Sequence, residues 1–68
     1  MYKDVKRRRE ALGLTQKQVA ELAGMKLIMY QRIEQGMRNP RLMTARKIAD
    51  VLRVSLDIFL TDEKREER

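Results

Sequence analysis

Basic side chains are the most abundant chemically active groups in this 68-residue chain. Sixteen Lys and Arg stand against ten Asp and Glu, which gives a formal charge of +6. Residues 62–68 hold four acids and three bases, so residues 1–61 carry a net charge of +7. A surplus of this size favours a polyanionic partner, either nucleic acid or an anionic membrane surface, over an ordinary solvated surface.

Side chains that carry enzyme chemistry are scarce. The chain has no Cys and no His, which excludes disulfides, the usual zinc sites and thiol or imidazole catalysis. Ser55 is the only serine, so a serine nucleophile with a base partner is not expected. We therefore expect no enzyme activity, metal, cofactor or small-molecule substrate. No run approaches the roughly 20 apolar residues that span a bilayer, so we expect a cytoplasmic protein without a membrane partner.

Glycine and proline divide the chain into short helical segments. Gly13, Gly24, Gly36 and Pro40 separate stretches of about ten residues whose apolar positions follow helical rather than alternating spacing. We expect one all-α domain over residues 1–61 and a charged, flexible C-terminal tail over residues 62–68. Five helices are predicted, over residues 2–12, 16–23, 27–35, 40–52 and 56–60.

The side chains expected to face the core recur three or four residues apart in these segments. Thr15, with Gln18 three residues later, forms a capping-box pattern at the start of the second helix, and Ser55 is the expected N-cap of the fifth. The predicted inward residues are Tyr2, Val5, Arg9, Leu12, Val19, Ala20, Leu22, Ala23, Tyr30, Ile33, Leu42, Ala45, Ile48, Ala49, Leu52 and Phe59.

The stretch from Gln16 to Gln35 meets the steric requirements of two helices that cross at about 90–120° through a short turn. Gly24 provides the positive φ that the turn needs, and Ala20 is small enough for a close approach at the crossing. The angle between the helices is filled by apolar residues at suitable spacing, namely Val19, Ala23, Met25, Tyr30 and Ile33.

From about Val5 to Leu60 the chain resembles the helix-turn-helix family of phage repressors, Cro and Xre-type regulators. Besides residues 16–35, the matching motifs lie at residues 12–16, at 33–36 with 38–40, and at 48–49 with 52–57. Four matches in the correct order make the resemblance specific. It implies a bacterial or phage protein with a compact five-helix, lambda-repressor-like DNA-binding domain, in which the second and third helices form the helix-turn-helix.

The resemblance also implies a role for the residues around the third helix. Base contacts are expected on its groove-facing side from Leu27, Ile28, Gln31 and Arg32. Thr15 and Gln16 match positions where the family sets helix N–H groups and a glutamine against a phosphate. Further phosphate contacts are expected from Lys26, Gln35, Arg38 and Arg41.

Arg9 and Glu34 match a pair that the family often joins by a salt bridge. Arg9 lies on the inward face of the first segment, where a charged side chain needs a partner. We expect this pair to fix the orientation of the third helix.

The start of the third helix departs from the family, whose recognition helices usually present polar residues there. Four consecutive apolar residues, Leu27 to Tyr30, cannot all face inward, so Leu27 and Ile28 are expected to project outward. Three interpretations remain: contact with thymine methyl groups, contact with a protein, or burial under a shifted helix. Lys26 also departs, since it cannot cap the helix, and its charge there is unfavourable by about 0.3–1 kcal/mol unless a phosphate is near.

These patterns lead to one main functional prediction. We expect a sequence-specific transcriptional regulator, most simply a repressor, that binds an inverted repeat in double-stranded DNA as a homodimer through the major groove. The dimer surface is expected in the C-terminal helices, where Met43 and Ile58 are not needed for the core. The alternative is an antitoxin-like interaction module whose Leu27 and Ile28 bind a protein partner.

Overall fold

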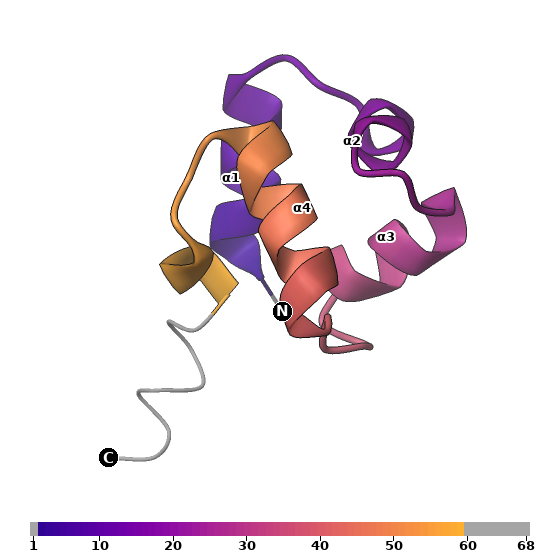
Figure 1. The fold of residues 1–68 in the computed structure, drawn as a ribbon. Coiled ribbons are helices and arrows are strands. Elements are labelled where there is room, and N and C mark those ends of the chain that lie inside the picture. Colours follow the sequence, from indigo (N-terminus) through magenta and orange to yellow (C-terminus); the bar gives the residue numbers. More distant parts are fainter. Residues whose placement is uncertain (1, 60–68) are drawn as a thin grey trace.

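Four α-helices and one 3-10 helix make up residues 2–59, the part of the chain that this computed structural model describes. The helices are α1 (Lys3–Ala11), α2 (Gln16–Leu22), α3 (Leu27–Glu34), α4 (Leu42–Leu52) and the 3-10 helix η1 (Leu56–Phe59). No strand occurs in this range. Figure 1 shows α4 in the middle, with α2 and α3 on one side and η1 on the other, and α4 contacts α1, α2 and η1.

The expected all-α architecture is confirmed for the described residues, but the expected fifth α-helix is wrong. The segment that begins at Leu56 forms a 3-10 helix of four residues, a length typical of 3-10 rather than α-helical turns. Ser55 acts at its start as expected, because its Oγ accepts a hydrogen bond from the backbone N–H of Asp57 at 3.2 Å. Leu60 and the predicted tail over 62–68 lie outside the described residues.

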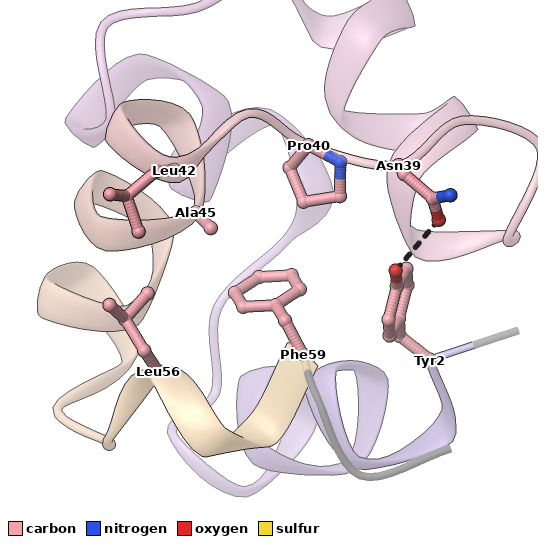
Figure 2. A pocket seen from close by; sticks show the side chains of 7 residues that line it. All are labelled: Tyr2, Asn39, Pro40, Leu42, Ala45, Leu56 and Phe59. Carbon is pink, nitrogen blue, oxygen red and sulfur yellow. Dashed lines mark hydrogen bonds between the residues drawn. The ribbon is translucent and has the colours of Figure 1, made fainter. Parts of the chain in front are cut away.

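The inward faces of the four α-helices meet in one core, closed at one end by aromatic rings. Tyr2 and Phe59 pack edge to face, with ring centroids 5.3 Å apart (Figure 2). The Tyr2 hydroxyl donates a hydrogen bond to Asn39 Oδ1 at 2.9 Å, which ties the start of α1 to the loop before α4. The largest fully buried side chains are those of Val5, Val19, Tyr30, Ile33, Ile48 and Leu52.

Three leucines that were predicted to face the core are exposed. They are Leu12, Leu22 and Leu42, and each lies at an end of its helix. In a domain this small, the core covers only the central turns of a helix, so the periodic pattern overestimates burial at the ends.

A buried ion pair joins α1 to α3, as the family resemblance implies. Nε and Nη2 of Arg9 donate to the two carboxylate oxygens of Glu34 at 2.8 and 3.2 Å, in a bidentate arrangement. Arg9 also donates to the Leu14 carbonyl at 2.9 Å, and the Tyr30 hydroxyl donates to Glu34 at 2.7 Å. Within residues 2–59, every buried side-chain nitrogen or oxygen has a hydrogen-bond partner.

The protonation states of this cluster are set by its hydrogen bonds. Burial opposes ionisation of Glu34, but the hydrogen bonds from Arg9, Tyr30 and Gln16 outweigh it and lower the pKa of this carboxyl. Burial, reinforced by the hydrogen bond to Glu34, raises the pKa of the Tyr30 hydroxyl. The hydrogen bond to Glu34 raises the pKa of Arg9. Arg9 and Glu34 are therefore both charged, and Tyr30 is neutral, over the physiological range of pH.

We predict that Glu34→Ala lowers the free energy of unfolding by about 3–5 kcal/mol, because it leaves the Arg9 guanidinium buried without a counter-ion. Denaturant unfolding measures this loss. Glu10→Ala is the matched control, since the Glu10 carboxylate lies 4.0 Å from the same guanidinium but is exposed to solvent. The control should lose no more than about 1 kcal/mol. Equal losses in the two variants would contradict a structural role for the buried pair.

Stability should depend on pH through the same cluster. The lowered pKa of Glu34 means that its ionisation stabilises the fold above its ordinary value of 4.5, and this contribution disappears as the pH falls through the folded-state pKa. The raised pKa of Tyr30 acts in the opposite sense, so its contribution is present below pH 10.0 and disappears as the pH rises further. In melting experiments, the difference in Tm between wild type and Glu34→Gln should shrink as the pH falls below 4.5. Parallel Tm curves across that range would show that Glu34 does not carry the acid dependence.

Candidate nucleic-acid interface

One face of α3 projects from the domain while the other is buried in the core. Tyr30, Ile33 and Glu34 are buried. The four residues predicted to face a groove lie on the opposite side, because positions i, i+1, i+4 and i+5 share one face of a helix. Leu27 is 37% exposed and Ile28 is 50% exposed, so the interpretation of these two side chains as extra core is wrong.

The turn before α3 is built by Gly24 and a pair of backbone hydrogen bonds. Gly24 has φ +71°, the left-handed conformation that the sequence predicts for this position. The N–H of Met25 donates to the Ala20 carbonyl at 2.9 Å and the N–H of Gly24 to the Glu21 carbonyl at 3.1 Å, which is a Schellman ending of α2. Only two residues, Met25 and Lys26, separate this glycine from α3, so the direction of α3 is fixed relative to α2.

Lys26 occupies the N-cap position of α3 and provides no side-chain cap. The first backbone N–H groups of α3 therefore lack the side-chain acceptor that most helices have at this end. The Lys26 side chain is exposed next to them. This part of the domain presents donors and a positive charge to its surroundings.

A chain of hydrogen bonds runs from the buried ion pair to the outward face of α3. Gln16, at the start of α2, donates from Nε2 to Glu34 Oε1 at 2.8 Å. Its Oε1 accepts from Nε2 of Gln31 at 3.2 Å. Both glutamine side chains are half-buried and held in defined orientations. Their hydrogen bonds were not predicted from the sequence, which indicated only that Arg9 would pair with Glu34.

Thr15 begins α2 with the predicted capping box. Its hydroxyl accepts from the N–H of Gln18 at 3.0 Å, and the Gln18 side chain accepts from the N–H of Thr15 at 2.8 Å. These two bonds use the threonine hydroxyl and two backbone donors, while the N–H groups of Gln16 and Lys17 have no acceptor within the helix.

The stretch of chain that contains α3 is strongly basic. Between Leu22 and Ala49 the only acidic residue is Glu34, which is buried against Arg9. The same stretch contains six basic residues, which are Lys26, Arg32, Arg38, Arg41, Arg46 and Lys47, and all six are exposed.

The loop from Gly36 to Arg41 brings two of these cations close to α3. A hollow of about 260 Å³ is lined by Met29 and Ile33 of α3, by Arg38 and Arg41 of the loop, and by Thr44 of α4. Arg38 and Arg41 therefore lie beside the C-terminal half of α3, and Gln35, the exposed C-cap of that helix, precedes them. The residues predicted to contact phosphate therefore lie at the two ends of α3 and, for Thr15 and Gln16, at the start of α2.

Metal-binding clusters and membrane-spanning helices are both absent from residues 2–59. No group of three or more His, Cys, Asp or Glu within residues 2–59 is arranged to hold a metal ion. Among the same residues, no helix is long and apolar enough to cross a membrane.

The profile of the helix-turn-helix family matches residues 5–59. A protein of Haemophilus influenzae, named as an uncharacterized HTH-type transcriptional regulator, is 40% identical over 58 residues, a match that covers 85% of this chain. The chain spans only 59% of the length of that relative. No solved structure matches the chain significantly. Because the profile covers the turn at Gly24 and both helices around it, this chain belongs to the Xre/Cro-type helix-turn-helix family.

Proposed function

We propose that this protein is a sequence-specific transcriptional regulator that inserts α3 into the major groove of double-stranded DNA. The observation that carries the proposal is the outward face of α3, which is held by the Arg9–Glu34 cluster behind it and surrounded by exposed cations. An α-helix fits the width of the major groove, and the basic surroundings attract the phosphates on either side. The name of the Haemophilus relative supports this assignment.

Gln31 and Arg32 are suited to hydrogen-bond bases. Arg32 is exposed and can donate two parallel hydrogen bonds to the O6 and N7 atoms of guanine. Gln31 already donates one amide hydrogen to Gln16, which leaves its Oε1 and its second hydrogen in a fixed orientation. That pair of groups matches the N6 and N7 atoms of adenine.

The residues at the two ends of α3 and at the start of α2 would contact the DNA backbone. Lys26, Arg38 and Arg41 supply positive charge, and Gln35 supplies an amide. The second amide hydrogen of Gln16 and the backbone N–H groups after Thr15 supply neutral donors. Such contacts set the register of the protein on the duplex, while the base contacts supply the specificity.

A homodimer on an inverted repeat would supply the affinity that one small module lacks. The dimer surface that fits best lies at the C-terminal helices. Leu42 and Met43 are exposed at the start of α4, beside a pocket of about 340 Å³ whose apolar wall includes Leu56 and Phe59 (Figure 2). Ile58, which was also expected there, is half-buried against the core. A dimer bound across a promoter would repress transcription by occlusion.

Contact between α3 and a protein partner is the alternative function. Exposed Leu27 and Ile28 fit it, but the six cations and the absence of an exposed acid between Leu22 and Ala49 favour DNA.

The dependence of binding affinity on salt concentration distinguishes DNA binding from protein binding. DNA affinity should fall steeply as salt is added, with a slope that drops by about one for each phosphate contact removed, as in Arg38→Ala. Binding through an apolar contact would change little.

Selection of bound sequences from a random duplex pool tests the proposal. The wild type should enrich an inverted repeat with half-sites about 10 bp apart from centre to centre. Arg32→Ala should lose discrimination of about 1–3 kcal/mol at one base pair in each half-site, since the guanine contact is removed. Gln31→Ala should do the same at a second base pair.

Arg53→Ala is the control for the loss of positive charge. Arg53 is exposed at the C-terminal end of α4, and its replacement should leave the enriched sequence unchanged. A pool that yields no enriched sequence, or an Arg32→Ala variant that selects the wild-type sequence with the same discrimination, would refute the proposed function. A single half-site in place of the repeat would refute the homodimer alone.

A further inference from the structure

We infer that Leu27 and Ile28 recognise the C5-methyl groups of pyrimidines, so that the operator contains thymine, or an equivalent 5-methylpyrimidine, opposite the first turn of α3. This inference rests on the proposed function and names the chemical group that the start of the recognition helix contacts. It follows from the position of the two side chains, from their chemistry and from the charge around them.

Leu27 and Ile28 lie at the N-terminal end of α3, the end that would approach the bases most closely. In helix-turn-helix proteins the N-terminal residues of the recognition helix contact the base edges. Leu27 and Ile28 are the first two residues of α3, and both are exposed. No side chain from Lys26 covers this end of the helix as a cap.

The apolar chemistry of Leu27 and Ile28 fits one kind of group on the base edges of the major groove. Aliphatic side chains neither donate nor accept hydrogen bonds. Most groups on the major-groove edges of the bases are hydrogen-bond donors or acceptors. An aliphatic side chain that covers them would remove their hydrogen bonds to water and provide none in return. The C5-methyl group of thymine is the apolar group on those edges. An apolar pair at the start of α3 therefore selects for methyl groups and against the other edges.

The charge around the pair favours DNA over a protein as its occupant. Lys26 adjoins Leu27, and Arg32 lies one turn after Ile28. Neither Lys26 nor Arg32 forms a salt bridge within residues 2–59, where the ion pairs are those of Arg9 with Glu34 and Glu10. An apolar contact that is flanked by unneutralised cations matches a methyl group flanked by phosphates.

The spacing along α3 also predicts where the methyl group lies. Four residues advance by about 6 Å along a helix, and successive bases of one strand are about 3.4 Å apart. Ile28 precedes Arg32 by four residues, and Leu27 precedes Gln31 by four. The methyl groups should therefore lie within one or two base pairs of the guanine and adenine that Arg32 and Gln31 contact.

Replacement of thymine by uracil in the selected duplex tests the inference, because uracil lacks only the methyl group. Binding of the wild type should weaken by about fourfold for each contacted methyl that is removed, and thymines outside the contacted positions should show no effect. Where cytosine replaces a contacted thymine, 5-methylcytosine should bind about fourfold more tightly than cytosine. This arm uses the wild-type protein, so no question of folding arises.

The protein variants complete the test. Ile28→Ala and Leu27→Ala should each bind the thymine and uracil duplexes more nearly equally than the wild type does. Leu22→Ala removes a leucine of α2 that is more exposed than either of these residues, and it should keep the full preference for thymine. Equal wild-type affinity for the two duplexes, or a preference that survives in both α3 variants, would overturn the inference while the proposed function holds. If the pool yields no enriched sequence, the proposed function and the inference about methyl groups fail together.

Discussion

The buried ion pair between Arg9 and Glu34 is the interaction on which the rest of the structure depends. It links α1 to the last turn of α3, and Tyr30 and Gln16 hydrogen-bond to the same carboxylate. Buried pairs of this kind contribute little net stability compared with apolar replacements, but each charge is costly without its partner. The geometry of α3 is therefore restricted to the arrangement in which the carboxylate keeps all its donors.

That restriction extends to the surface of the domain. Gln16 connects Glu34 to Gln31, so a side chain on the outward face of α3 is oriented by a charge in the core. At the other end of α3, the turn at Gly24 fixes its direction relative to α2. A helix that is held at both ends need not be ordered when it binds, so this preorganisation would lower the conformational cost of the proposed association with DNA. The same core residues thus provide both the fold and the rigidity of the proposed interface.

Much of this arrangement could be predicted from the sequence where a residue type has a narrow structural use. A charged residue on an apolar face, as at Arg9, needs a partner, and a threonine three residues before a glutamine, as at Thr15, forms a capping box. Features set by tertiary packing could not be predicted. Nothing local shows that Gln16 reaches Glu34, or that Leu22 lies beyond the core. The end of α4 at Leu52 agrees with the predicted range, but the left-handed conformation of Arg53 (φ 59°), which glycine usually adopts at such a position, could not be predicted from the residue type.

We propose that the outward face of α3, held from behind by the ion pair, is the surface that meets DNA. Amide chemical shifts of ¹⁵N-labelled protein, followed by NMR while the selected duplex is added, test it most directly. The claim predicts that the largest changes occur at residues 26–35 and at the start of α2, with small changes in the buried half of α4. Changes centred instead on Leu42, Met43 and Leu56, with α3 unaffected, would contradict it.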